Sequence, residues 1–508
     1  MFKKGIMLKK ALVLGLSGLL LMSGCGNRKY SVTPKTGPSE ESSLEETKEA
    51  EESVEEEVSE EEKTTSESSE EAKEGHNYTG GKEVIVYFAN WNLDEKSAKD
   101  GGEVSGIPWE SVTYINHAFW EVLPDDGSKE TSFERRDNGD EPRTKFAIAP
   151  TDAYSDMQHE EESEEIQGLA RNHFSEYAYF SEMYPDVNIM ISVGGWTDCG
   201  YFSEMAYTKE GRESFTESCV ELIKKYPWID GIDIDWEYPG GSTDGERAPE
   251  DESDEGCPIW GTAAEDNQNF GELLKNMRER FDAEFGEGTK KLTACASAST
   301  GYTLCCQDWT LAEPYLNLIN IMTYDLAGTW DASTGFMTSV NGAQTAAKYL
   351  KVKGIPVSKL NIGSPMYAMC EKMKKIDKSG IVGAPIESDA PNTEEIDQNT
   401  IREWEKSAQS GYTVVCDDEG RFVKGEEFDN ETTGWHMKYH PVQGTVYMYN
   451  DDETSPYYCW YVSYENSASL QLKLDLIYDM DLAGIIVWEV SEDSTDKDLI
   501  RQMGQFLK

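Results

Sequence analysis

The sequence predicts an α/β fold in which eight parallel strands form a closed (β/α)8 TIM barrel that carries a small α+β insertion domain. Eight short apolar runs of strand-like composition occur along the chain, and amphipathic helical patterns lie between them. Alternating strands and helices indicate a parallel sheet, and eight repeats indicate closure into a barrel. One connection is anomalous, because about a hundred residues separate the seventh run from the last helical pattern, far more than a barrel connection needs.

The strand candidates are followed by chemically distinctive residues at their carboxyl-terminal ends. In chain order they are 84–88, 112–119, 187–193, 230–237, 292–298, 316–324, 360–367 and 484–488. Helical spacing of apolar residues occurs over 215–226, 270–281 and 470–477. In a barrel of this kind the carboxyl ends of the strands form the rim on which active sites are built. We therefore expect the functional site at that rim.

The long connection predicts a separate domain at residues 371–460, so that 81–370 and 461–508 make up the barrel. Short β-rich runs fill the insertion, at 412–416, 435–439, 445–449 and 457–462. Its rings, among them Trp404, Trp435 and Trp460, could stack on a ligand beside the rim or form the domain's own core. A domain of this size must bury several large side chains, which favours the core for most of them.

The amino-terminal 25 residues have the composition of a bacterial lipoprotein signal peptide. Four lysines precede an apolar run at 11–22 that is too short to span a bilayer permanently. The run ends in Met22-Ser-Gly-Cys25, which resembles a lipobox and predicts lipidation of Cys25; an ordinary signal peptide is the alternative. Residues 26–80 predict an acidic, disordered stalk, since 17 Glu and 3 Lys lie between residues 39 and 74 with no aromatic residue. We expect an extracytoplasmic protein held to the cell membrane by a lipid.

Charge and cysteine usage narrow the choice of ligand. The formal net charge is -51, which excludes nucleic acid as a partner and leaves a neutral ligand such as a sugar. Nine of the ten cysteines follow Cys25, without CxxC or His-rich spacing. The odd count and the absence of such spacing argue against a zinc site and against a disulfide framework, although isolated disulfide pairs stay possible. We expect a monomer without a metal or cofactor.

The segment 230–237 has the pattern of a catalytic strand. Successive side chains of a strand point to opposite faces, so Asp233, Asp235 and Glu237 form one row while the apolar residues between them form the other. Buried carboxylates in line cannot all ionise, and they must hold unequal pKa values. The alternatives are a solvated edge strand, which the apolar flanks disfavour, and a hard-cation site, which usually recruits acids from several elements.

Three motifs together resemble glycoside hydrolase family 18, the chitinase family. Residues 230–237 match its DGxDxDxE signature, 192–195 its SxGG motif and 322–325 its MxYD motif. Tyr87, Phe119 and the strand 484–488 also match, and the resemblance is collinear from about residue 83 to the carboxyl terminus. The insertion looks like the one in the deep-cleft branch of that family.

The resemblance implies a retaining hydrolase of β-1,4 bonds in N-acetylglucosamine polymers that uses the substrate's acetamido oxygen as nucleophile, through an oxazolinium intermediate. Glu237 would protonate the leaving oxygen and then activate water. Asp235 would hold the acetamido N–H, Tyr324 would hydrogen-bond its carbonyl, and Asp233 would exchange a proton with Asp235. The residues implied to bind substrate are Tyr87, Phe119, Gly195, Trp196, Met322, Asp325, Tyr367 and Trp488.

Two other functions fit the same residues. An endo-β-N-acetylglucosaminidase of glycoproteins, or a peptidoglycan hydrolase, would use the same acetamido-assisted chemistry. A catalytically silent sugar-binding protein is the alternative outside enzymes, but such proteins usually lose the acid of the signature, and Glu237 is present. One departure bears on substrate preference: Ala368-Met369 stands where the deep-cleft branch commonly has Gly-Arg.

Overall fold

The structure is a computed structural model that describes residues 78–91, 103–124, 144–160, 166, 168–243, 257–387, 396–416, 422–430 and 432–508. The chain divides into two units, Met1–Glu74 and Gly75–Lys508, and the described residues all belong to the second. The predicted signal peptide, Cys25 and nearly all of the predicted stalk therefore lie outside the described residues. Within the described ranges, no helix combines the length and apolar character needed to cross a bilayer.

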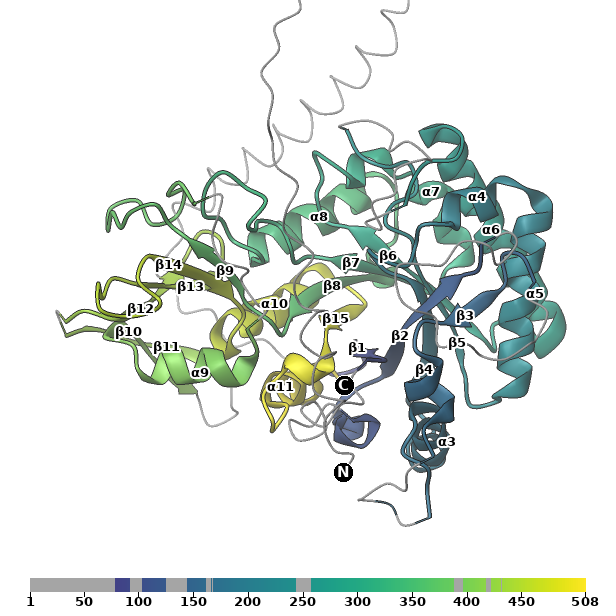
Figure 1. Ribbon diagram of the computed structural model, residues 1–508, viewed down its shortest axis with the longest axis horizontal. Coiled ribbons are helices and arrows are strands. Elements are labelled where there is room, and N and C mark those ends of the chain that lie inside the picture. Colours follow the sequence, from purple (N-terminus) through teal and green to yellow (C-terminus); the bar gives the residue numbers. More distant parts are fainter. Residues whose placement is uncertain are drawn as a thin grey trace, which may run out of the picture. The chain divides into compact units, whose positions relative to one another are not determined.

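Eight parallel strands close into a barrel, which confirms the predicted fold class (Figure 1). The strands follow one another in the order β1-β15-β8-β7-β6-β5-β4-β2, and β2 pairs back with β1 to complete the ring. Their bounds are β1 Glu83–Ala89, β2 Tyr114–Val122, β4 Asn188–Gly194, β5 Gly231–Asp235, β6 Lys291–Ser297, β7 Leu318–Met322, β8 Leu360–Pro365 and β15 Gly484–Trp488. A short strand that the sequence did not reveal, β3 (Ile148–Pro150), pairs antiparallel with the end of β2.

The helices that follow the barrel strands bury their apolar stripes against them. The predicted helical patterns are confirmed: Phe215 and Ile223 of one helix and Phe270 and Phe281 of the next are buried in the core. Threonine hydroxyls cap both of these helices at their amino ends, as expected for good N-caps. The helices of the barrel are α3 His173–Met183, α4 Phe202–Tyr207, α5 Lys209–Lys225, α6 Ala263–Phe285, α7 Trp309–Ala312, α8 Val340–Val352, α10 Ser467–Met480 and α11 Asp498–Leu507.

A second sheet lies between β8 and α10 in the sequence, in the order β11-β10-β12-β13-β14-β9. Its elements are β9 Met369–Lys372, α9 Gln398–Lys406, β10 Ser410–Cys416, β11 Phe422–Asp429, β12 Trp435–His440, β13 Thr445–Asn450 and β14 Trp460–Tyr464. The sheet extends slightly beyond residues 371–460 at both ends, because its first strand in the sequence begins at Met369 and its last, which pairs with the first, ends at Tyr464. Trp404 and Trp435 stack at 4.7 Å between ring centroids in its core, as expected for a domain that must bury large rings.

The second sheet holds the loop that joins β7 to α8. Tyr461 donates its hydroxyl to the carbonyl of Gly335 at 2.8 Å, and the amide of Met337 donates to Ser463 at 3.0 Å. Thr445 at the start of β13 donates to the carbonyl of Thr338 at 2.8 Å. This loop starts just after β7 with the motif residues Tyr324 and Asp325, so the insertion supports one wall of the barrel rim.

Candidate active site

Strand β5 separates its apolar and acidic side chains as the alternation predicts. Ile232, Ile234 and Trp236 are buried in the core between the strands and the helices. Asp233 and Asp235 point into the barrel and are almost fully buried, while Glu237, two residues beyond the end of the strand, is half-buried. The three acids therefore form a column that rises from the barrel interior to the rim.

Asp233, at the bottom of this column, is surrounded by donors. Its Oδ2 accepts from the hydroxyls of Tyr87 at 2.8 Å and Ser192 at 2.9 Å. Its Oδ1 accepts a short hydrogen bond from Thr293 and a longer one from the amide of Asn320, at 3.3 Å. Hydrogen bonds to a carboxylate favour its charged form. Asp233 is thus equipped to carry the negative charge of the site even though it is buried.

The other two acids lack such support. Burial raises the pKa of Asp235 well above its ordinary value, and the charges of Glu237 and Asp233 raise it further. Its Oδ1 is buried without a hydrogen-bond partner among the described residues. Burial also raises the pKa of Glu237, to about 7, with the charge of Asp325 adding to the effect. Burial raises the pKa of Asp233 as well, but there the hydrogen bonds from Thr293, Tyr87 and Ser192 oppose it. The three acids are thus unequally supported in their charged forms, as acid catalysis requires.

Glycines let neighbouring strands approach the acids closely. Gly194 and Gly195 have positive φ values, and a Cβ on Gly194 would lie 2.1 Å from the carbonyl oxygen of Asp235. The amide of Gly195 donates to the same carbonyl at 2.8 Å, and a Cβ there would meet the ring of Phe119 at 2.7 Å. The second and third residues after Ser192 must therefore be glycine for β4 to pack against the acid strand.

Tyr324 is positioned by a buried hydrogen-bond network below it. The preceding Thr323 donates its hydroxyl to the carbonyl of Gly363 at 2.8 Å and accepts from the same residue's amide at 2.7 Å. Thr338 donates to the carbonyl of Thr323 at 2.8 Å. The ammonium of Lys473 donates to Thr338 at 2.7 Å and to the carbonyl of Gly363 at 2.8 Å. The ring of Tyr324 lies so close to Gly363 that a Cβ there would be 2.7 Å from it.

The charge of Lys473 is balanced by one carboxylate. Lys473 and Glu465 are both buried, and their charged atoms lie 2.5 Å apart. Glu465 also accepts from the hydroxyl of Ser364 on β8, at 3.0 Å. A cation and an anion from α10 and the end of β14 are thus enclosed directly beneath the residues that support Tyr324.

The structure divides the predicted substrate-binding residues into two groups. Trp196 is 48% exposed and Trp488 is half-buried, and the ring of Phe119, which stacks on Trp488 at 5.4 Å, is itself buried. Tyr87 and Tyr367, however, are only 1% and 2% exposed. Their rings do not line an open surface as expected.

The hydroxyls of these two tyrosines point to acids. Tyr87 donates to Asp233, and Tyr367 donates to Asp325 at 2.5 Å. Gly195 lies against Phe119, and Met322 is half-buried beside the interior cluster. Ala368 is buried and Met369 begins β9.

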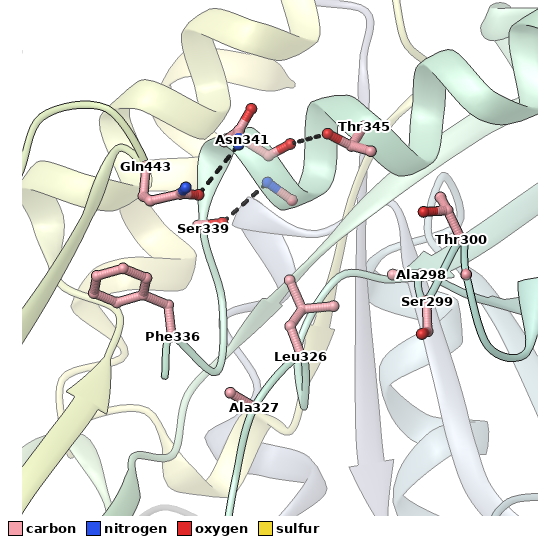
Figure 2. A pocket seen from close by; sticks show the side chains of 12 residues that line it. Ala298, Ser299, Thr300, Leu326, Ala327, Phe336, Ser339, Asn341, Thr345 and Gln443 are labelled. Atoms are coloured by element: carbon pink, nitrogen blue, oxygen red, sulfur yellow. Dashed lines mark hydrogen bonds between the residues drawn. The ribbon is translucent and has the colours of Figure 1, made fainter. Parts of the chain in front are cut away.

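A hollow of about 370 Å³ with a mixed polar and apolar lining lies elsewhere on the rim, and none of the predicted site residues lines it. Figure 2 shows Ser299 and Thr300, which follow β6, on one side and Phe336 on the other, with Leu326 between them. Asn341 of α8 donates its amide to Gln443 at 3.2 Å, between α8 and the turn of the second sheet. None of the described residues that line the hollow carries a carboxylate, so the hollow is separate from the acid column.

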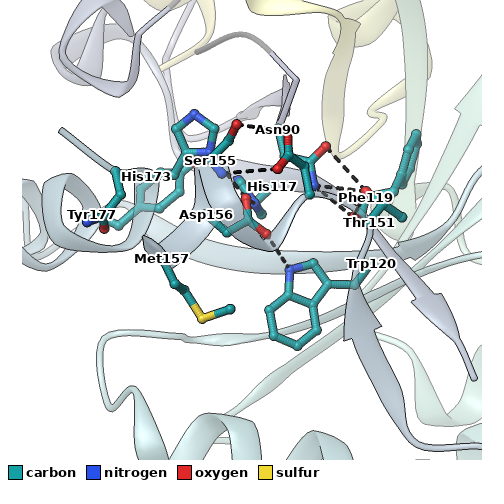
Figure 3. A network of polar contacts seen from close by, with 12 residues as sticks. Asn90, His117, Phe119, Trp120, Thr151, Ser155, Asp156, Met157, His173 and Tyr177 are labelled. Atoms are coloured by element: carbon teal, nitrogen blue, oxygen red, sulfur yellow. Dashed lines mark hydrogen bonds and ion pairs between the residues drawn. The ribbon is translucent and has the colours of Figure 1, made fainter. Parts of the chain in front are cut away.

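A buried cluster behind β2 brings two histidines to one aspartate (Figure 3). Asp156 Oδ1 lies 2.8 Å from His117 Nε2 and 3.2 Å from His173 Nδ1, and its Oδ2 accepts from the indole of Trp120 at 3.1 Å. Burial lowers the pKa of His173, so its ring stays neutral and donates. The carboxylate of Asp156 is thus already hydrogen-bonded to these donors. We interpret the cluster as a hydrogen-bond network and not as a metal site. One member of the cluster, His117, directly precedes the Ala118–Phe119 peptide at the rim.

Sequence reasoning missed several residues that contact the acids. Thr293 and Cys295 alternate on β6 toward the barrel interior, and Asn320 does so on β7; the alternation rule applied to every strand would have indicated them. Trp91 is 54% exposed, and its ring lies 6.4 Å from that of Trp488. It stands two residues beyond β1, outside the motifs.

Comparisons with known proteins agree with this geometry. The family described as "Glycosyl hydrolases family 18" matches residues 83–493. Chitinase ChiA of Flavobacterium johnsoniae is 26% identical over 465 residues, which cover 82% of this chain and 27% of that protein. Chitinase A1 of Niallia circulans is 28% identical over 334 residues, which cover 61% of this chain and 41% of that protein.

This chain spans less than two thirds of the length of each of these relatives. The solved Group IV chitinase of Ostrinia furnacalis has the same fold, with a TM-score of 0.60 at 20% identity, and the match covers 83% of this chain and 99% of that one. A barrel of eight parallel strands, the acid column on β5 and a family match over most of the described residues agree: the chain belongs to glycosyl hydrolases family 18.

Proposed function

We propose that this protein is a retaining glycoside hydrolase that cleaves β-1,4 bonds next to N-acetylglucosamine, with chitin oligosaccharides as substrate. The observation that supports it most is the column of Asp233, Asp235 and Glu237, whose pKa values differ in the way that proton transfer to a leaving group requires. The relatives named above are described as chitinases. This family works without an enzyme nucleophile, so the usual two-carboxylate scheme does not apply.

Each step of the proposed reaction has a group suited to it. The acetamido oxygen of the substrate attacks the anomeric carbon while the bond to the leaving oxygen breaks and Glu237 supplies that oxygen with a proton. Tyr324 stays a neutral phenol, because burial raises its pKa, and it donates to the acetamido group. Asp235 gives up its proton toward Asp233 and accepts the acetamido N–H. Water then attacks the anomeric carbon, whose bond to the acetamido oxygen breaks, and the Glu237 carboxylate takes a proton from that water.

A comparison of three substrates tests the proposal. We expect release of shorter sugars from chitotetraose, and the same incubations with a high-mannose glycopeptide and with purified cell wall serve as the alternatives. No release from chitotetraose would end the chitinase proposal. Release from only one of the other two would reassign the substrate and keep the chemistry, and binding to all three without turnover would make the protein a lectin.

The pH dependence of kcat/KM should report on Glu237. The acid form is the one that can protonate the leaving oxygen, so activity requires protonated Glu237. Because the pKa of Glu237 is raised to about 7, the protonated fraction falls as pH rises through that value. We expect kcat/KM for chitotetraose to fall on the alkaline side with an apparent pKa near 7. A profile that stays flat from pH 6 to 9 would contradict this assignment.

We also propose that Cys25 carries a lipid that anchors a monomer outside the cytoplasm. The lipobox-like sequence and the acidic stretch after it support this, and both lie outside the described residues. Fractionation of cells that express a Cys25→Ala variant would test the anchor. Unchanged association with the membrane would contradict it.

A further inference from the structure

Cys295 lies on the inner face of β6, level with the acid pair. Thr293 pairs with Asp233 in the register between β5 and β6, and Ile234 pairs with Ala294. Continuing that register by one step places Cys295 opposite Asp235. Since side chains alternate along a strand, Cys295 faces the barrel interior with Thr293. It is almost completely buried there.

The contacts of the Cys295 thiol identify it as a hydrogen-bond donor. Its sulfur lies 2.9 Å from the hydroxyl oxygen of Tyr87 and 3.8 Å from Asp233 Oδ2. Tyr87 has one hydroxyl hydrogen, and that hydrogen is donated to Asp233 at 2.8 Å. The S–H hydrogen is therefore free to point to the tyrosine oxygen or to a carboxylate. A thiol has a single weak donor, which is enough for one of these at a time.

The thiol stays protonated in this position. Burial raises the pKa of Cys295 well above its ordinary value, and the charges of Asp233 and Asp235 raise it further. A neutral thiol is not a nucleophile or a ligand. The thiol acts instead as a donor: its hydrogen bond lowers the pKa of Asp235, whereas burial and the neighbouring charges raise that pKa.

We propose that Cys295 is a positioning residue for the Asp233–Asp235 pair, whose S–H donates to whichever carboxyl is ionised and so sets how the pair divides its proton. This rests on the proposed function, in which Asp235 must become a carboxylate to hold the acetamido N–H. A donor to the charged form stabilises that form. The methyl group of alanine is not a donor, and the hydroxyl of serine is a stronger donor than the thiol of cysteine. The ionised pair should therefore be least stable with alanine, more stable with cysteine and most stable with serine.

Other titratable groups surround the thiol, and they define what a pH profile can report. Tyr87 faces it from β1, and Asp233 and Asp235 face it from β5. Glu237, beyond the end of β5, and Tyr324, beyond the end of β7, act on it as well. Burial keeps both phenols neutral by raising their pKa values. Glu237 determines the alkaline side of the profile, which leaves the acidic side to the aspartate pair.

The test is kcat/KM for chitotetraose against pH in the wild type, Cys295→Ala and Cys295→Ser. Activity requires one ionised member of the pair, and it is lost as pH falls and both become protonated. Without a donor, protonation occurs at higher pH, so the acidic limb of Cys295→Ala should move up by about one pH unit. The limb of Cys295→Ser should move down. Shifts in opposite directions are not expected from a purely structural role.

A second measurement does not depend on turnover. In the infrared difference spectrum of wild type minus Cys295→Ala, we expect an S–H stretching band at lower frequency than that of a free thiol, and we expect it to shift as the acids titrate. If the alanine variant does not fold, the pH difference spectrum of the wild type supplies the same band. Cys219→Ala, which removes a buried thiol from α5 away from the acids, should leave both the pH profile and this band unchanged.

The outcomes separate this inference from the proposed function. Acidic limbs that coincide in all three proteins, or that move in the same direction, would overturn the role of Cys295, as would a band at the frequency of a free thiol. A wild type that is inactive on every N-acetylglucosamine substrate would overturn the proposed function instead. The infrared band would then still decide whether the thiol donates to the carboxylates.

Discussion

Replacing Glu237 by glutamine is expected to lower kcat for chitotetraose by about 100-fold or more, with KM changed by only a small factor. Glutamine has the same shape and can still contact the substrate, but it cannot transfer a proton to the leaving oxygen. The half-buried position of Glu237 above two other acids makes it the residue of the column that substrate can reach. The measurement is steady-state kinetics at pH 6, where the wild-type acid is mostly protonated.

The matched control for this variant is Glu371→Gln. Glu371 on β9 is another buried glutamate whose pKa is raised to about 7 by burial, with Asp331 adding to the effect, but it belongs to the second sheet. The loss of a buried, partly protonated glutamate at that position should leave kcat within a few-fold of wild type. Similar losses in both variants would show that the effect at Glu237 reflects general damage to the fold and not proton transfer.

Replacing Lys473 by methionine is expected to reduce the free energy of unfolding by about 3–5 kcal/mol. The substitution leaves Glu465 with a buried, uncompensated charge, and it removes the donor shared by Thr338 and the carbonyl of Gly363. Methionine fills most of the same volume, so the loss comes from electrostatics and hydrogen bonding rather than from a cavity. Urea unfolding followed by tryptophan fluorescence measures it.

Two further variants define the cause. Lys473→Met combined with Glu465→Met removes both charges, and it should recover much of the lost stability because no buried ion remains. Lys359→Met breaks a more exposed ion pair with Glu313 and should cost less than about 1 kcal/mol. If the double variant is as unstable as Lys473→Met alone, the unpaired carboxylate is not what destabilises the single variant.

Most strands of the barrel were predictable because burial on both faces makes them rich in apolar residues, and β5 was predictable from the alternation of its acids with apolar residues. The ends of the strands were less predictable. The predicted strand 316–324 continues to Tyr324, yet β7 ends at Met322, because the amide of Thr323 turns back to the carbonyl of Ile321 at 2.9 Å. β3 was missed because three residues are too few to show a period.

The residues around the acids were only partly predictable. The column on β5 follows from alternation within one strand, which a sequence displays directly. Asn320 and Cys295 contact the same acids through the register between different strands, and register is set by the packing of the whole barrel. Tyr87 was placed correctly on β1, but its hydroxyl reaches Asp233 instead of its ring facing the solvent, because a barrel of eight strands is filled by its own side chains.

The hydrogen bonds between the second sheet and the loop from β7 to α8 affect how chimaeras of this family should be built. Tyr461, Ser463 and Thr445 donate to or accept from three backbone groups of that loop. A crossover near residue 369, at the apparent domain border, would combine the second sheet of one parent with the β7–α8 loop of the other and so break up these hydrogen-bonded pairs. A junction before residue 323 would exchange the loop and the sheet as one block, so that each parent keeps its own set of contacts.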